Sequence, residues 1–313
     1  MDYKLLNGDA VEVLKTLEDK SVQTCITSPP YYGLRDYGVD GQIGMEETPD
    51  EYINRLVEVF REVKRVLKDD GTLWVNIGDS YCSSNGMERV NNRFKREGSK
   101  GASANDRDLK VLHGCGYKTK DLIGIPWMLA FALRADDWYL RDDIIWLKRN
   151  PLPESVTDRC TRCYEHIFLL SKSPKYYFDS ESIKEPTTSS NEYVRDRDHT
   201  KLNNTPGRTH MGGLKTNNYE MRNKRNVWDV PVSSYKGAHF ATYPEKLIEP
   251  CVLAGSKEGD TVLDIFNGSG TTGAVALKNK RDYIGIDLNR DYLDLSEERL
   301  KCAEIEGSKT KLW

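Results

Sequence analysis

The sequence predicts a doubly wound α/β fold, in which one central sheet is covered by helices on both faces. Segments rich in β-branched and aromatic residues alternate along the chain with segments of helical periodicity. Several of the strand segments, such as Val262–Phe266, carry apolar side chains on both faces, which is typical of a sheet buried between two helix layers. These two observations favour the α/β class for a chain of 313 residues.

Seven strands are expected from short apolar runs bounded by turn residues. In chain order they are Tyr3–Gly8, Val22–Ser28, Gly71–Ile77, Leu140–Lys148, Tyr164–Ser171, Thr261–Phe266 and Tyr283–Leu288.

The clearest predicted helix runs from Pro49 to Lys68. Thr48 can cap its first turn, proline suits the first helical position, and Gly71 follows its end. Apolar residues recur along it at helical spacing and form one stripe that can face the core. Further helices are expected at residues 10–18, 122–135, 244–255, 270–279 and 290–304.

Two basic segments interrupt this alternation, although the net charge of the whole chain is only −3. Residues 87–120 hold nine Lys/Arg against four Asp/Glu, and residues 191–226 hold eight against four. Both are rich in side chains that can hydrogen-bond to nucleic acid as well as neutralise phosphates. We therefore expect one catalytic domain formed by residues 1–173 and 236–313, with a basic loop insertion at 82–120 and a target-recognition region at 174–235.

The chain lacks the pattern of a signal peptide, and its longest apolar stretch, Ile123–Leu133, is too short to span a bilayer. Its seven cysteines are scattered, as expected for reduced thiols. Cys160 and Cys163 lie near His166, but a fourth ligand at suitable spacing is missing, so no metal site is predicted. We expect a cytoplasmic protein, in a bacterium or a phage-infected cell, without a membrane partner.

A glycine-rich turn, Asp264–Gly273, joins a predicted strand to a predicted helix. Glycines allow the backbone to turn sharply and to approach a ligand closely. Asp287 ends the following strand, where a carboxylate can accept both ribose hydroxyls of an adenosine-containing ligand. The turn also matches the dinucleotide fingerprint, so an NAD-linked oxidoreductase is a rival at this point. Against it, Asp264 would repel a pyrophosphate but could hold an ammonium such as that of methionine.

A second motif, Thr27-Ser28-Pro29-Pro30-Tyr31, follows the second predicted strand. Two prolines stiffen the backbone and remove two amide donors, so nearby carbonyls can accept hydrogen bonds from a ligand. If Ser28 Oγ and the Pro29 carbonyl each accept one proton of an exocyclic amino group, the nitrogen can pyramidalise and direct its lone pair at a methyl group. Tyr31 can stack on the base that carries this amino group.

Together, these motifs resemble those of the β class of bacterial and phage DNA amino-methyltransferases, in which the catalytic motif precedes the AdoMet-binding motif. The resemblance extends to Asn7-Gly8-Asp9, to Leu140–Lys172 beside the target-base pocket, and to His239–Leu247, whose helix start cradles the methionine end of the cofactor. It covers nearly the whole chain except the two basic insertions. It implies a seven-stranded, Rossmann-like methyltransferase fold that is circularly permuted.

The resemblance also implies residue roles and partners. The cofactor is S-adenosyl-L-methionine (AdoMet), and the substrate is double-stranded DNA whose target base is flipped out. A homodimer and a cognate restriction endonuclease, as in a restriction-modification system, are compatible with it. The expected catalytic residues are Ser28, Pro29, Pro30 and Tyr31. The expected cofactor-binding residues are Asp9, Asp264, Phe266, Asn267, Gly268, Ser269, Gly270 and Asp287.

Ser28 stands where many adenine-N6 enzymes of this type have Asp, and serine here is similar to the cytosine-N4 enzymes. We therefore expect methylation of cytosine N4, with adenine N6 as the alternative within the same fold. Side chains at 174–235 able to read base edges are Arg195, Arg197, Asn203, Arg208, Asn217, Arg222 and Arg225. A catalytically silent DNA-binding protein is the alternative from another class, and a turnover assay separates it.

Overall fold

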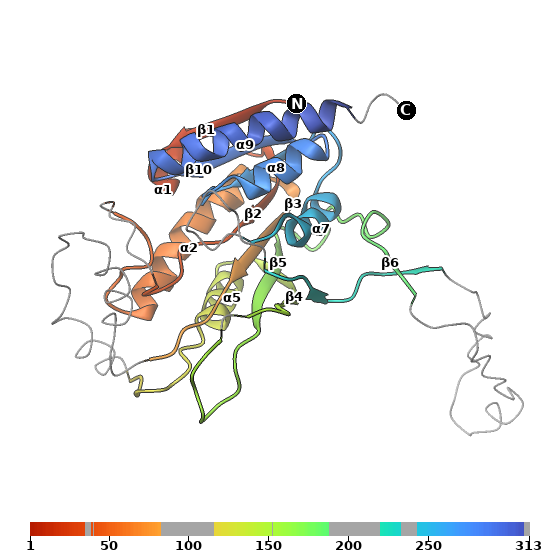
Figure 1. Ribbon diagram of the computed structural model, residues 1–313. Coiled ribbons are helices and arrows are strands. Elements are labelled where there is room, and N and C mark those ends of the chain that lie inside the picture. The colour runs from red at the N-terminus through yellow and green to blue at the C-terminus, as the bar shows by residue number, and fades with distance from the viewer. Residues whose placement is uncertain are drawn as a thin grey trace, which may run out of the picture.

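The computed structural model describes residues 1–34, 39, 41–82, 116–151, 153–187, 220–232 and 243–309. Within these residues the main sheet has eight strands in the order β1-β10-β9-β2-β3-β5-β4-β8 (Figure 1). Their bounds are β1 Tyr3–Asn7, β2 Val22–Thr27, β3 Leu67–Ile77, β4 Tyr139–Leu147, β5 Tyr164–Ser171, β8 Val227–Asp229, β9 Thr261–Asp264 and β10 Asp282–Asp287.

In the sheet, strands from the C-terminal part of the chain lie between strands from its N-terminal part. β9 and β10, from the last quarter of the sequence, lie between β1 and β2, and these strands together with β3 run parallel. β5 is antiparallel to both β3 and β4. From β9 the chain crosses to β10, and from β2 it crosses to β3 on the opposite side, so the strand order reverses between β9 and β2. A crevice is expected outside the carboxyl ends of the strands at such a reversal.

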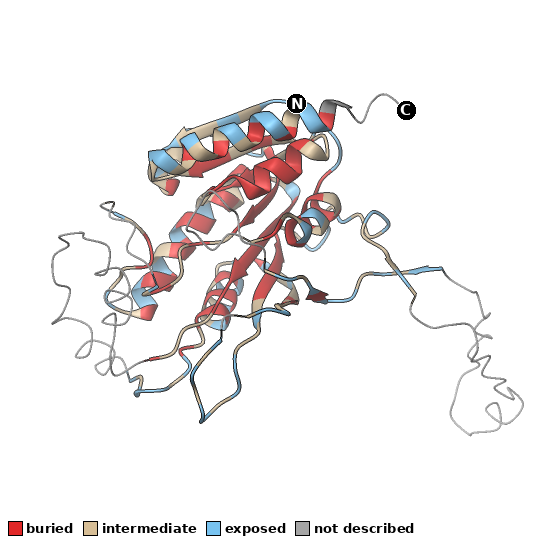
Figure 2. Ribbon diagram, viewed as in Figure 1, coloured by how far each residue is buried: buried red, intermediate tan, exposed pale blue. Residues whose placement is uncertain are grey.

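Helices cover both faces of the sheet, as predicted. One face packs against α1 (Ala10–Leu14), α2 (Pro49–Val66) and α5 (Ile125–Ala135). The other packs against α7 (Glu245–Gly255), α8 (Thr271–Lys278) and α9 (Arg290–Lys309). Consecutive side chains of β3 face opposite sides of the sheet, since Val75 belongs to the first core and Trp74 to the second. Buried residues line the inner side of each helix layer (Figure 2).

All seven predicted strands and all six predicted helices are present, and the α/β class is confirmed. Thr48 caps α2 as expected, and it forms a capping box with Glu51. α5 begins only at Ile125, because Gly124 occupies the cap with a φ of 85°. The eighth strand, β8, was not predicted. Its three residues pair with β4 in parallel, so the end of the 174–235 range joins the main sheet.

Much of the two basic insertions, residues 83–115 and 188–219, lies outside the described residues. The ends of the second are held together, because β6 (Glu185–Pro186) pairs antiparallel with β7 (Met221–Arg222). This two-stranded ribbon projects away from the main sheet (Figure 1). Within the described residues, every helix is too short or too polar to cross a bilayer.

Candidate active site

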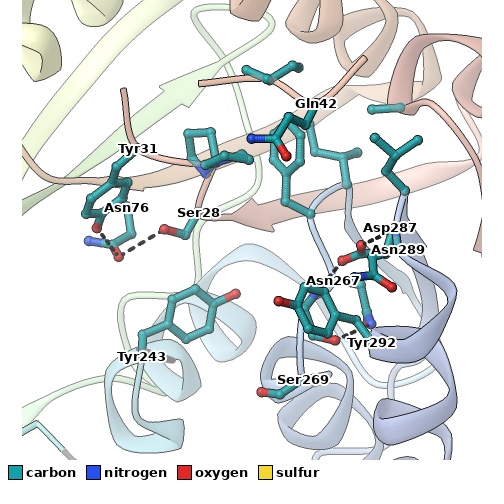
Figure 3. Close-up of a pocket in the computed structure, with 18 of the residues that line it drawn as sticks. Ser28, Tyr31, Gln42, Asn76, Tyr243, Asn267, Ser269, Asp287, Asn289 and Tyr292 are labelled. Carbon is teal, nitrogen blue, oxygen red and sulfur yellow. Dashed lines mark hydrogen bonds between the residues drawn. The ribbon is translucent and has the colours of Figure 1, made fainter. Parts of the chain in front are cut away.

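A cavity of about 260 Å³ opens at the carboxyl ends of β9 and β2, where the strand order reverses. It is lined both by the glycine-rich turn after β9 and by the Ser-Pro-Pro-Tyr segment after β2. Figure 3 shows Ser28, Tyr31 and Asn76 on one side of this cavity, and Asp287 and Asn267 on the other. The two motifs, more than 200 residues apart in sequence, therefore share one site.

At the glycine-turn end, Asp287 is the main charged group. Its two carboxylate oxygens accept one backbone N–H each, from Gly268 at 2.7 Å and from Asn289 at 2.9 Å. Burial raises the pKa of this carboxyl to about 6, although the two backbone donors act in the opposite direction. A carboxylate oxygen can accept more than one hydrogen bond. Asp287 can therefore still bind a pair of hydroxyl groups presented from the cavity.

Asp264 lies beneath the turn and does not line the cavity. It is 1% exposed, and its carboxylate accepts hydrogen bonds from the Thr27 hydroxyl, the Thr272 hydroxyl and the Phe266 amide at 2.7, 2.7 and 3.1 Å. The Tyr243 hydroxyl donates a fourth at 3.0 Å. Burial raises its pKa against the effect of these donors. Asp264 thus ties β2, α8 and the segment before α7 together, rather than presenting a free carboxylate to a ligand.

The fold requires glycine at position 270, whether or not a ligand is bound. It caps α8 with a left-handed φ of 73°, and a Cβ there would lie 2.7 Å from the Cβ of Ser296 in α9. Gly270 does not line the cavity, whereas Phe266, Asn267, Gly268 and Ser269 do.

Asp9 lines the cavity but is already engaged. One of its oxygens accepts the amides of Val11 and Glu12, which caps α1, and the other lies 3.4 Å from Arg55 Nη2. Gly8 and Ala10 line the cavity beside it.

The four residues Ser28 to Tyr31 all line the cavity. The Pro30 carbonyl accepts a hydrogen bond from the Tyr52 hydroxyl at 2.8 Å. The described residues place no donor on the Pro29 carbonyl, so it is available to a ligand. The Tyr31 hydroxyl donates to Glu165 Oε2 at 2.7 Å. Its ring lies so close to Gly78 that a Cβ there would be 2.7 Å from Tyr31 Cε2. The tyrosine is therefore held at its hydroxyl by Glu165 and packed closely against Gly78.

Asn76, near the end of β3, sets the direction of the Ser28 hydroxyl. Its amide nitrogen donates to Glu165 Oε2 at 3.2 Å and to the His166 carbonyl at 3.1 Å. These two acceptors fix the amide so that Oδ1 faces Ser28 Oγ, at a long 3.4 Å. A hydroxyl whose proton points toward Asn76 has its lone pairs free to face the cavity. Ser28 can therefore accept a hydrogen bond from a ligand there.

Glu165 joins this network to a cation. Its Oε2 accepts the Tyr31 hydroxyl and the Asn76 amide, and its Oε1 pairs with the ammonium of Lys148. Trp146, Lys148 and Glu165 all line the cavity. They come from the end of β4, from the residue that follows it and from the start of β5, a region that by resemblance was expected beside the base pocket.

Sequence reasoning missed Asn76 and the individual roles of Glu165 and Lys148. A signal for Asn76 was present, because a polar side chain interrupts the apolar run Leu73–Ile77 at the end of a buried strand. Tyr243 was placed at a helix start by resemblance, and it does precede α7, with its hydroxyl 2.5 Å from Thr272 Oγ1.

The chain matches the DNA methylase family of N6 and N4 methyltransferases over residues 22–298. It is 48% identical over 297 residues to the Type II methyltransferase M.Cfr9I of Citrobacter freundii, covering 95% of this chain and 87% of that protein. It is 46% identical to M.SmaI of Serratia marcescens, over 95% of this chain and 90% of that protein. In fold it resembles the PvuII cytosine-N4-specific DNA methyltransferase, with a TM-score of 0.64 at 19% identity, covering 99% and 92% of the two chains.

These similarities show that the chain belongs to the DNA methylase family, the DNA amino-methyltransferases that take their methyl group from AdoMet. The predicted class, fold and cofactor are therefore confirmed, and the NAD-linked oxidoreductase is excluded. The family includes enzymes that methylate N4 of cytosine and enzymes that methylate N6 of adenine, so membership does not identify the methylated atom.

Proposed function

We propose that this protein methylates N4 of cytosine in double-stranded DNA, with the target base flipped into the cavity beside Ser28. The observation that supports transfer to an exocyclic amino group is the Ser28–Asn76 contact, which leaves the serine oxygen able to accept a hydrogen bond next to the free Pro29 carbonyl. The choice of cytosine rests on the presence of serine at position 28. Two acceptors at one point suit an exocyclic amino group, which has two protons to donate.

The residues of the cavity also fit AdoMet. Asp287 offers a carboxylate to the ribose hydroxyls, and Phe266 offers an apolar surface near it. Ser269 and Thr271 lie at the amino end of α8, where backbone donors and the helix dipole favour a carboxylate such as that of methionine. When bound, AdoMet supplies an electrophilic methyl group on a sulfonium.

The roles of the protein groups follow from this arrangement. Ser28 Oγ and the Pro29 carbonyl each accept a hydrogen bond from the amino group. These two hydrogen bonds favour a pyramidal nitrogen, whose lone pair is no longer conjugated with the ring. Tyr31, held by Glu165 and Gly78, offers its ring to the base. Because Ser28 is neutral, the amino group meets no charge there. Serine at this position is also the reason that we propose cytosine, and not adenine, as the methylated base.

Asp264 and Gly270 take supporting roles in this proposal. Asp264 organises the turn through the Thr27, Thr272 and Tyr243 hydroxyls, and Gly270 allows α8 and α9 to pack. Asp9 caps α1 at the edge of the cofactor end.

We also propose that the 174–235 region recognises the DNA sequence. The C-terminal end of this region is attached to the wall of the cavity, since Trp146 Nε1 donates to the Val230 carbonyl at 2.7 Å and β8 pairs with β4. Arg222 and Arg225 are both paired with Glu185, at 2.9 and 2.8 Å, so they brace the ribbon. The other side chains predicted to read bases lie outside the described residues. A homodimer and a cognate endonuclease stay predictions.

The test is mass spectrometry of nucleosides from unmethylated DNA that has been incubated with the protein and AdoMet. We expect N4-methylcytosine. N6-methyladenine would retain the site and overturn the use of Ser28 as a cytosine signal. Absence of any methylated base, with AdoMet binding intact, would refute the proposed reaction.

A further inference from the structure

Lys148 occupies an unusual place for a lysine. It follows the last residue of β4, its side chain is only 20% exposed, and it lines the cavity that holds Ser28 and Tyr31. Lysines are rarely this buried unless they are paired. The Ser28 hydroxyl, the Asn76 amide, the Glu165 carboxylate and the Lys148 ammonium form one continuous polar network along the wall of the cavity.

The position of the ammonium is fixed from two sides. It pairs with Glu165 Oε1, and it lies 4.4 Å from the centre of the Trp146 ring, over the ring face. Glu165 is itself 14% exposed and is held through its other oxygen by Tyr31 and Asn76. Within the described residues Glu165 is the single acceptor bonded to Lys148 Nζ, and an ammonium has three donors. Donors therefore remain for a ligand in the cavity.

The chemistry of the base determines what those donors can meet. In cytosine, the ring atoms after the amino-bearing carbon are an acceptor nitrogen, N3, and then the carbon C2, which carries the carbonyl oxygen O2. In adenine, the corresponding atoms are the acceptor N1 and then a C–H group. A donor aligned with the second position therefore satisfies cytosine and leaves itself unpaired against adenine, which costs binding free energy in a partly buried site.

We propose that Lys148 is the residue that reads the N3/O2 edge of the target cytosine while Ser28 and Pro29 hold its amino group. This inference rests on the proposed cytosine function and names a determinant of base choice that the Ser-Pro-Pro-Tyr motif lacks. Glu165 acts as a positioning residue, because it holds the ammonium in place and compensates its charge when the cavity contains no base.

The experiment uses the full-length protein and a duplex that contains its methylation site, mapped first from DNA that the protein has methylated. The target cytosine is compared with a 2-aminopyridine C-nucleoside, which keeps the amino group and the adjacent ring nitrogen but has C–H in place of the C2 carbonyl. The assay is run in alkaline buffer so that the pyridine nitrogen stays unprotonated. For the wild type, kcat/KM should be about 10- to 100-fold higher for cytosine than for the analogue.

In Lys148→Met this preference should fall to about one, while AdoMet affinity is unchanged. The double variant Lys148→Met/Glu165→Gln removes the unpaired carboxylate and should show the same loss of preference. Lys68→Met is the matched control: Lys68 also pairs with a carboxylate, Asp260 at 2.8 Å, but does not line the cavity, so the wild-type preference should remain.

The outcomes separate the role of Lys148 from the choice of cytosine. Methylation of adenine by the wild type would overturn the proposed function. Methylation of cytosine with no preference over the analogue, or an undiminished preference in Lys148→Met, would overturn the role of Lys148 and leave the proposed function intact.

Discussion

The affinity for AdoMet should weaken at acid pH because of one carboxyl group. Asp287 has a pKa of about 6, raised chiefly by burial, and its carboxylate is proposed to accept the ribose hydroxyls. Hydroxyl donors favour the charged form, so bound AdoMet should lower this pKa and expel a proton. Affinity should therefore be full above the pKa and fall as the pH drops through it.

The magnitude follows from the fraction that is ionised. With a pKa of about 6, about one tenth of Asp287 is charged at pH 5, so the apparent Kd should be about tenfold higher there than at pH 8. Isothermal titration calorimetry in buffers with different ionisation enthalpies measures both the Kd and the proton release.

Asp287→Asn is the corresponding variant. It should bind AdoMet about 10- to 100-fold more weakly, because the charged acceptor is lost, and its Kd should vary little between pH 5 and pH 8. A wild-type Kd that is constant over this range, or a variant with the wild-type pH dependence, would refute the role of Asp287.

Three further substitutions test the packing around the site. Asn76→Ala should lower kcat about 10- to 100-fold with AdoMet affinity unchanged, because Ser28 loses the group that directs its proton; stopped-flow methylation and AdoMet titration measure the two effects. Gly78→Ala should displace the Tyr31 ring, whose Cε2 would lie 2.7 Å from the new methyl group, and methylation should fall while AdoMet binding persists. Gly270→Ala should lower the free energy of unfolding in urea by about 1–3 kcal/mol, because φ is 73° and Ser296 Cβ would lie at 2.7 Å; an unchanged midpoint would contradict this.

The fold could be predicted from the sequence because its strands and helices have strong local signals. The apolar run at Val262–Phe266 and the capped, amphipathic segment after Thr48 each specify their element without help from distant residues. β8 could not be predicted, because its three residues are a strand only through pairing with the edge of β4. Short strands of this kind depend on tertiary contacts more than on propensity.

The site was predictable as two motifs but not as a network. Ser28 and Asp287 stand in recognisable segments, whereas the function of Asn76 depends on contacts with Glu165 and His166, some 90 residues away. The surroundings of Asp264 were equally hidden. Its position beside the glycine turn suggested a ligand contact, which stays a prediction, whereas in the structure its carboxylate accepts hydrogen bonds from the hydroxyls of Thr27, Thr272 and Tyr243.

The role of Ser28 is tested most directly by the single-turnover rate of Ser28→Ala at saturating AdoMet and DNA. We expect a rate about 100-fold below that of the wild type, with the AdoMet Kd within about twofold, because the serine oxygen acts on the amino group and lies apart from the cofactor end of the cavity. A rate equal to that of the wild type would contradict the assignment of Ser28 and, with it, the proposed mechanism.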